Sequence, residues 1–175
     1  TELSEEAQQI GAVNCIQIKR DEFGVKLKGF NTDAFGFEMS LQPLLKPQHK
    51  KALVFGNGGA TKAVAYVLKK IDIDFQIVSR QKTADHLAYS QLTPEVIKDH
   101  LLLINCTPLG TFPNIQECPD IPYHAIGSEH LLYDLIYNPQ ETTFLNKGKE
   151  NGAQIKNGYE MLVLQAEKNW QIWNQ

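Results

Sequence analysis

The sequence contains little cysteine, no long apolar run and no surplus of positive charge, and each shortage excludes a class of protein. Its three cysteines (Cys15, Cys106 and Cys118) are odd in number and lack the spacing of metal ligands. That pattern argues for reduced thiols, no metal site and a cytoplasmic location. No apolar stretch approaches the roughly 20 residues that a membrane-spanning helix needs. The acidic residues 1–6 lack the basic and apolar regions of a signal peptide.

Acidic and basic side chains nearly balance, with 17 Lys and Arg against 20 Asp and Glu. Binding to nucleic acid or to an anionic membrane needs a basic surplus, so we expect neither partner. The 175 residues, 42% of them hydrophobic, suffice for one domain or slightly more with a buried core. The chain begins with Thr rather than Met, and we expect it to be part of a longer polypeptide. We expect a monomer or a homodimer.

Residues 47–175 alternate between strand-like and helix-like stretches. The predicted strands are 52–55, 75–78, 101–104, 131–135 and 153–155, which are short and mostly apolar. The predicted helices are 61–70, 94–98, 144–150 and 160–173. Alternating strands and helices predict an α/β fold, a doubly wound parallel sheet covered by helices on both faces. Trp170 and Trp173 in the closing helix are predicted to be core or packing residues rather than site residues.

Residues 1–46 show a different pattern and are predicted to belong to another unit. The expected elements are a short helix at 4–10, strands at 12–18 and 24–27, and a polar turn at 31–33 before a helix. Asp33 stands where it can cap that helix. The basic linker 46–51 contains Pro47 and marks the predicted boundary.

A run of small residues follows the first predicted strand of the main domain. The run is Gly56, Asn57, Gly58, Gly59 and Ala60. The first glycine allows a tight turn, and the second lets backbone approach a pyrophosphate. The next helix then offers unpaired N–H groups and a positive dipole end to that anion. Because Thr61 replaces the third glycine of the strict motif, an ordinary turn between strand and helix is the alternative.

The segment after the second predicted strand bears on the choice of dinucleotide. It consists of Ser79, Arg80, Gln81, Lys82, Thr83 and Ala84. A protein that binds NAD usually has an acid there for the ribose hydroxyl. Here Arg80 could hold a 2′-phosphate bidentately with Lys82 nearby, and the first acid, Asp85, comes later. The sequence therefore favours NADP over NAD, with a solvated pair of surface cations as the alternative.

Several further stretches occur in the order and spacing of one known family. All the matching stretches are Gly11-Ala12-Val13-Asn14, Gly29-Phe30-Asn31-Thr32-Asp33, Gly36-Phe37, Gly56-Asn57-Gly58-Gly59-Ala60, Ser79-Arg80, Asn105-Cys106-Thr107-Pro108-Leu109-Gly110, Asp134-Leu135-Ile136-Tyr137-Asn138-Pro139, Asn157-Gly158, Met161-Leu162 and Gln165-Ala166. Over nearly its whole length the chain resembles the shikimate dehydrogenase family. The resemblance implies an NADP-binding, Rossmann-like domain at 47–175 with a closing C-terminal helix. Residues 1–46 would be the C-terminal remnant of an α/β substrate-binding domain and its linking helix.

The resemblance also implies an activity and a set of site residues. The activity is NADP-dependent reduction of 3-dehydroshikimate to shikimate, in aromatic amino-acid biosynthesis. The residues expected to contact substrate are Asn14, Asp33, Tyr137 and Gln165, with Asp33 as the candidate catalytic residue. The cofactor would be lined by residues 56–60 and 79–84, together with Leu135 and Gly158. Amides and a phenol suit a polyhydroxylated acid because they donate and accept hydrogen bonds without adding charge.

Each substrate residue also has a simpler interpretation. Asp33 could serve only as a helix cap, Tyr137 could be a packing residue, and Gln165 could be solvated. The family's proton-transferring lysine and its serines for the substrate carboxylate would precede residue 1. An exposed Asp33 near its reference pKa of about 3.9 would be a weak base. The alternatives are therefore an NADP(H)-binding module without activity, or a quinate/shikimate dehydrogenase that also uses NAD.

Overall fold

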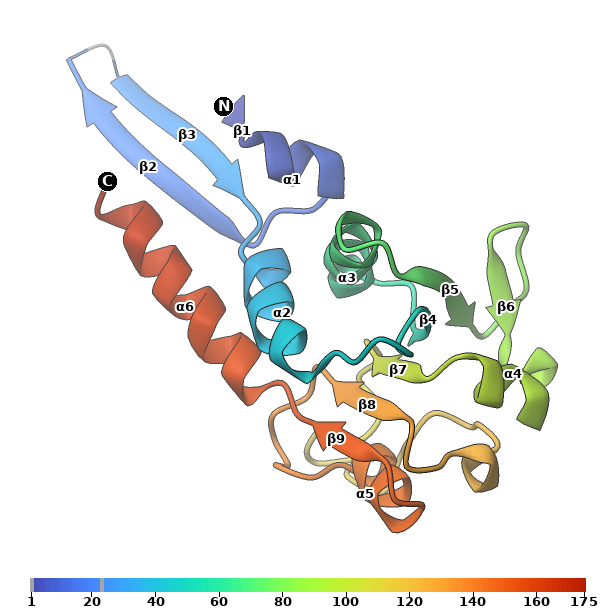
Figure 1. Ribbon diagram of the computed structural model, residues 1–175. Coiled ribbons are helices and arrows are strands. Elements are labelled where there is room, and N and C mark those ends of the chain that lie inside the picture. The colour runs from blue at the N-terminus through green and yellow to red at the C-terminus, as the bar shows by residue number, and fades with distance from the viewer. Residues whose placement is uncertain (1, 23) are drawn as a thin grey trace.

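The computed structural model describes residues 2–22 and 24–175, and its main body is a six-stranded parallel sheet (Figure 1). Its strands are β4 (Lys51–Phe55), β5 (Asp74–Ser79), β6 (His86–Ala88), β7 (Leu102–Asn105), β8 (Leu131–Asp134) and β9 (Gln154–Lys156). They lie in the order β6-β5-β4-β7-β8-β9, and every pairing is parallel. The direction of winding reverses between β4 and β7. The predicted doubly wound sheet is therefore confirmed.

Helices cover both faces of this sheet. They are α1 (Glu5–Ile10), α2 (Asp33–Leu41), α3 (Gly59–Lys70), α4 (Pro94–Asp99), α5 (Thr143–Glu150) and α6 (Tyr159–Trp173), with short 3-10 turns at Gln42–Leu44, Tyr89–Gln91 and Tyr123–Ala125. Side chains alternate along each strand, so Val54 faces α2 and α3 while Phe55 faces α4 and α5. Both residues are fully buried. Burial on both faces explains why β4, β7 and β8 are nearly continuous apolar runs in the sequence.

A smaller sheet stands at the other end of the molecule. It contains β1 (Glu2–Leu3), β2 (Cys15–Asp21) and β3 (Gly24–Phe30) in the order β1-β3-β2, and its β2–β3 hairpin projects away from the main sheet (Figure 1). The C-terminal end of α6 contacts this smaller sheet, where Trp173 Nε1 donates to the Ile16 carbonyl of β2 at 3.1 Å. Helices α2 and α6 pack so closely that a Cβ on Gly36 would lie 2.6 Å from the Met161 carbonyl. These helices come from the two sides of the predicted boundary at residues 46 and 47, which stays a prediction.

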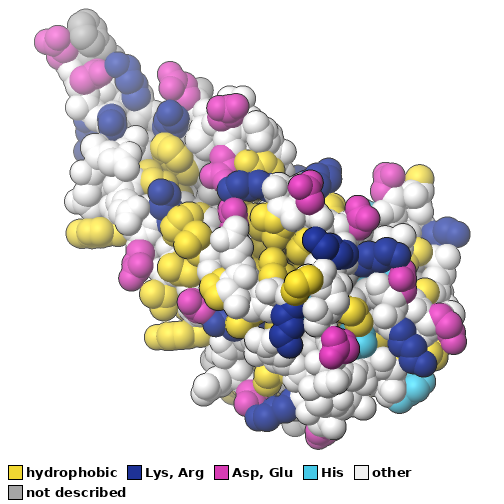
Figure 2. Space-filling view, in the orientation of Figure 1, with side chains coloured by type: hydrophobic (Ala, Val, Ile, Leu, Met, Phe, Trp, Pro, Cys, Tyr) yellow, Lys and Arg dark blue, Asp and Glu magenta, His cyan; other side chains and the backbone are white. Residues whose placement is uncertain are grey.

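Several local expectations are wrong, each for a physical reason. Asp33 is the first helical residue rather than the cap of α2, and Asn31 Oδ1 accepts the Ala34 N–H instead, at 3.1 Å. Trp170 and Trp173 are 67% and 55% exposed, so they are not core residues. Figure 2 shows apolar side chains along the flank formed by α6 and the hairpin.

Strand β6 was not predicted, although it extends the main sheet. It lies parallel to β5, yet only residues 80–85 separate the two strands. Parallel neighbours usually need a crossover of a dozen residues or more, so the pattern gave no sign of a strand so soon. Helix α3 begins at Gly59, earlier than the predicted residue 61. No helix in the described part of the chain is long and apolar enough to cross a membrane.

Candidate functional site

The glycine loop connects β4 to α3 at the point where the strand order reverses. Gly56 has φ +104°, in the left-handed region that favours glycine, and a Cβ there would lie 3.2 Å from the Cys106 carbonyl. Its N–H donates to the Val78 carbonyl at 2.8 Å. Thr61 Oγ1 donates to the Gly56 carbonyl at 3.0 Å, so the residue that departs from the strict motif fixes the loop from inside.

The first turn of α3 is left open toward solvent. Gly58 is the N-cap and Gly59 the first helical residue, so the predicted position of Gly58 outside regular helix or strand is confirmed. A Cβ on either glycine would meet no atom within 4 Å. The turn has no side-chain cap and no acidic residue. Its N–H groups are therefore free to receive an anion.

A hollow of about 390 Å³ lies between the loop after β4 and the loop after β7. It is lined by Gly56, Asn57, Gly58, Ser79, Arg80, Tyr89, Cys106, Thr107, Pro108 and Leu109. In a doubly wound sheet this crevice, outside the carboxyl ends of the strands, is where ligands bind. Its volume lies within the range of small-molecule sites. Gly59 and Ala60, also predicted to line the cofactor, form the start of α3 beside it.

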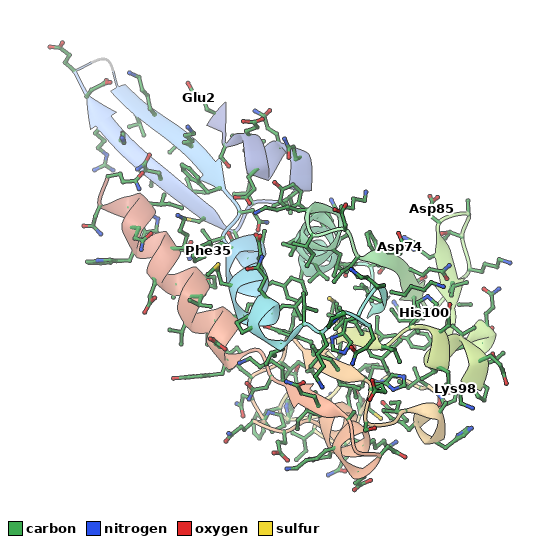
Figure 3. The ribbon with its side chains drawn as sticks, viewed as in Figure 1. Glu2, Phe35, Asp74, Asp85, Lys98 and His100 are labelled. Atoms are coloured by element: carbon green, nitrogen blue, oxygen red, sulfur yellow. The ribbon has the colours of Figure 1, made fainter. Side chains whose placement is uncertain are left out.

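The loop after β5 presents its cations to solvent. Ser79 is buried and its hydroxyl donates to the Gln81 carbonyl at 2.6 Å, which tightens the turn. Arg80 lines the hollow, and neither Arg80 nor Lys82 forms an ion pair within residues 2–22 and 24–175. Asp85 lies at the far end of the loop, just before β6 (Figure 3).

The remaining predicted cofactor residues occupy different places. Gln81, Lys82, Thr83 and Ala84 are exposed on the β5–β6 loop and are not among the residues lining the hollow. Leu135 follows β8, and its N–H donates to the Asn105 carbonyl at 3.0 Å. A Cβ on Gly158 would collide with the Leu135 carbonyl, so only glycine lets α6 begin this close to the end of β8.

Below the crevice lies a buried polar network that sequence reasoning missed. Asp134 is fully buried and accepts hydrogen bonds from Asn105 Nδ2 at 3.1 Å, the Ile136 N–H at 3.0 Å and Thr142 Oγ1 at 2.6 Å. Burial raises the pKa of Asp134 to about 6, although these hydrogen bonds oppose the rise. The signal available in the sequence was an Asn and an Asp, each ending an apolar strand.

Three of the four predicted substrate residues belong to a second polar cluster. Asn14 Oδ1 accepts the Thr32 N–H at 2.8 Å, and Thr32 Oγ1 donates to Asn169 Oδ1 at 2.7 Å. Asn169 Nδ2 in turn donates to Gln165 Oε1 at 3.0 Å. Asp33 follows Thr32 and is hydrogen-bonded to Asn14. Thr32 and Asn169 connect these residues and were not predicted.

Asp33 differs from the exposed carboxylate that the sequence suggested. Its side chain is mostly shielded, and burial raises its pKa above the ordinary range while the hydrogen bond from Asn14 opposes that rise. The expectation of an unperturbed Asp33 is therefore wrong. A desolvated carboxylate beside an amide can accept a hydrogen bond from a hydroxyl group.

Tyr137 is placed elsewhere. Its ring is 50% exposed and lines a different hollow, of about 290 Å³, together with Gln140, Asn157 and Tyr159. Asn157 Nδ2 donates to the Gln140 carbonyl at 2.8 Å and shapes this hollow. No hydrogen bond in the described part of the chain joins Tyr137 to the Asn14 cluster.

The doubly wound sheet, the glycine loop at its switch point and the open α3 N-terminus define a dinucleotide-binding protein of the Rossmann class. No family model matches the chain. It is 38% identical to the shikimate dehydrogenase (NADP(+)) of Clostridium botulinum strain Hall, covering 95% of this chain and 66% of that protein. The chain belongs to the shikimate dehydrogenase family.

Solved structures agree with that assignment. A chorismate mutase/shikimate 5-dehydrogenase fusion protein from Clostridium acetobutylicum matches with a TM-score of 0.82 and 34% identity, over 99% of this chain and 64% of that one. The Thermus thermophilus shikimate 5-dehydrogenase in complex with NADP(H) and shikimate matches with a TM-score of 0.80 and 32% identity, over 98% of this chain and 66% of that one. The chain thus spans slightly less than two thirds of the length of these relatives.

Proposed function

We propose that the crevice between β4 and β7 binds NADP(H), and that the chain is the cofactor-binding portion of an enzyme that reduces 3-dehydroshikimate to shikimate. The observation that carries this proposal is the glycine loop, which leaves the α3 N-terminus open beside Arg80, a side chain with no ion pair in the described part of the chain. These residues fit the cofactor: backbone N–H groups suit its pyrophosphate, and a guanidinium suits its 2′-phosphate. When bound, the nicotinamide supplies the hydride.

The protein's own groups would hold and orient the two reactants. The start of α3 would bind the pyrophosphate, with Gly58 allowing close approach. Around the second cluster, Asn14 and Gln165 would exchange hydrogen bonds with substrate hydroxyls, and Asp33 would accept one. Tyr137 would approach the substrate from the loop after β8. Such positioning lowers the barrier because reacting groups no longer have to be brought together from solution.

We propose further that these 175 residues by themselves bind the cofactor without turnover. Apart from the carboxylate of Asp33, the described side chains hydrogen-bonded to Asn14, Thr32 or Gln165 are amides and a hydroxyl, and none is a lysine or histidine. Hydride removal from a carbinol carbon also requires loss of the hydroxyl proton, and a positioned general base typically contributes about 10²–10⁴-fold. Apart from the carboxylate of Asp33, the described partners in the cluster include no such base.

A second candidate is an enzyme that also accepts NAD. The Listeria monocytogenes shikimate 5-dehydrogenase, 25% identical, has been solved in complex with shikimate and NAD. The acid that favours NAD is absent from the end of β5, which argues for NADP here. Calorimetric titration of the chain with NADP⁺ and NAD⁺ tests the proposal: NADP⁺ should bind at least tenfold more tightly, about 1.4 kcal/mol. Equal affinities would favour the second candidate, and no binding of either would refute both.

A further inference from the structure

Two loops that rise from neighbouring strands are tied together by one buried carboxylate. Asp134 ends β8 and is fully shielded from solvent. Oδ1 accepts from Asn105 Nδ2, at the end of β7, and from the Ile136 N–H in the loop beyond β8. Oδ2 accepts from Thr142 Oγ1, the N-cap of α5. Three separate segments therefore take their positions from one side chain.

Asn105 extends this connection to the wall of the crevice. Its Oδ1 accepts from the Thr107 N–H at 3.0 Å and from Thr107 Oγ1 at 2.6 Å. Thr107 Oγ1 accepts the Leu109 N–H at 3.2 Å, which closes a tight turn. Thr107 and Leu109 both line the hollow, whereas Asn105 and Asp134 do not. The carboxylate thus acts on the wall through an intermediate amide.

The topology indicates which half of a dinucleotide this wall faces. A doubly wound sheet consists of two mononucleotide-binding halves, and the glycine loop and the loop after β5 belong to the first. Strands β7 and β8 belong to the second. A dinucleotide lying across the crevice would place its adenosine 2′-phosphate near Arg80 and its nicotinamide half near the wall at Thr107.

We propose that Asp134 is a positioning residue that, through Asn105, sets the Thr107–Leu109 wall against the nicotinamide half of the cofactor. This inference rests on the proposed function. It predicts a selective defect: loss of the carboxylate disturbs the nicotinamide half and leaves the adenosine half intact. A side chain with only a structural role would weaken both halves together or neither.

The experiment compares two ligands by calorimetry. NADPH spans both halves, whereas 2′,5′-ADP contains only the adenosine, its phosphates and no nicotinamide. Asp134→Ala removes all three hydrogen bonds. We expect it to lower the affinity for NADPH by roughly tenfold, about 1.4 kcal/mol. The affinity for 2′,5′-ADP should change by less than about twofold. The fluorescence emission of bound NADPH reports the surroundings of the nicotinamide. In Asp134→Ala this emission should move toward that of the free cofactor.

Two further variants separate positioning from stability. Asp134→Asn keeps an oxygen for Asn105 and Ile136 and can donate to Thr142, so it should restore NADPH affinity and emission. Tyr133→Phe is the matched control, because it removes another buried hydrogen bond, to Ser40 Oγ at 2.7 Å, beneath the opposite face of the sheet. It should change the affinity for neither ligand.

The outcomes are distinguishable. Equal weakening of both ligands by Asp134→Ala, or no weakening of either, would overturn the positioning role. If Asp134→Ala does not fold, Thr107→Val breaks the same turn at its partly exposed end and must show the same selective loss. If the wild-type chain binds NADPH no more tightly than it binds 2′,5′-ADP, this inference alone is refuted. Wild-type chain that binds neither ligand would refute the proposed function as well.

Discussion

Thr142 Oγ1 donates a 2.6 Å hydrogen bond to Oδ2 of Asp134, and both side chains are completely shielded from solvent. The carboxylate has hydrogen-bond donors on both oxygens, yet burial still raises its pKa to about 6. A buried charge costs free energy that hydrogen bonds only partly offset. We therefore expect the ionisation of Asp134 to link the geometry of the crevice to pH.

Stability should decrease as Asp134 ionises. Because its folded pKa of about 6 lies above the ordinary 3.8, the folded state binds the proton more tightly than the unfolded state does. The stabilisation is complete below pH 3.8 and is lost as pH rises through 6. Urea unfolding measures the free energy of unfolding of wild type and of Asp134→Asn at each pH. The wild-type value minus the variant value should fall by roughly 1–3 kcal/mol as pH rises across this window. A difference that grows with pH would contradict the burial argument.

Arg80 should determine the preference for NADP. Losing a bidentate contact to a phosphate costs on the order of 1.5–3 kcal/mol. Arg80→Ala should therefore weaken NADP⁺ by at least roughly tenfold and leave NAD⁺ nearly unchanged, as measured by calorimetry. Arg20→Ala, which removes an exposed arginine on the hairpin strand β2, is the matched control and should affect neither. Equal weakening of both nucleotides by Arg80→Ala would make Arg80 structural.

The two loop glycines should respond differently to alanine. Gly56→Ala forces a Cβ into the left-handed region and against the Cys106 carbonyl, so we expect a loss of about 1–3 kcal/mol in the free energy of unfolding. Gly58→Ala meets open space, and stability should stay within about 0.5 kcal/mol. The methyl group of the new alanine would hold a pyrophosphate away from the α3 N–H groups. The affinity for NADP⁺ should therefore fall by roughly tenfold.

Gly127→Ala is the control for these two variants, since a Cβ there also meets open space and the φ of Gly127 lies outside the left-handed region. It should alter neither stability nor affinity. If Gly58→Ala binds NADP⁺ as tightly as the wild type does, the pyrophosphate does not lie at the start of α3.

The isolated 175-residue chain should bind NADP⁺ without oxidising shikimate. The polar cluster around Asp33 can orient a polyol, but its described partners are amides and a hydroxyl. An NADPH-formation assay with excess shikimate should show no turnover above the blank. A full-length relative assayed in parallel is the positive control. Turnover by the chain would assign the proton transfer to a residue within it, and Asp33→Asn would then identify whether that residue is Asp33.

Much of the fold could be predicted because the sequence expresses it locally. Strands β4, β7 and β8 are short, mostly apolar runs, since strands covered on both faces need apolar side chains at nearly every position. The glycine loop was recognisable because tight turns and close approach to phosphate both require residues without a Cβ. Strand β6 was not predicted because the connection from β5 to β6 contains no helix.

The candidate site was predictable only in part. Asn14, Asp33 and Gln165 were identified through the family resemblance, and their cluster forms across more than a hundred residues of chain. Thr32 Oγ1 reaches Asn169 Oδ1 only because α2 packs on α6. No local pattern marks such a pair, since the separation along the chain says nothing about distance in space.

The sequence by itself determined the alternation of strands and helices, the position of the glycine loop and the cations after β5. Tertiary structure alone decided that Asp33 would be desolvated, that Tyr137 would line a separate hollow, and that Asp134 would hold the wall of the crevice through Asn105. Local propensity and periodicity act over a few residues and are legible in the chain. Burial and hydrogen-bond partnership depend on which distant segments meet, and those meetings exist only after the sheet and its helices have packed.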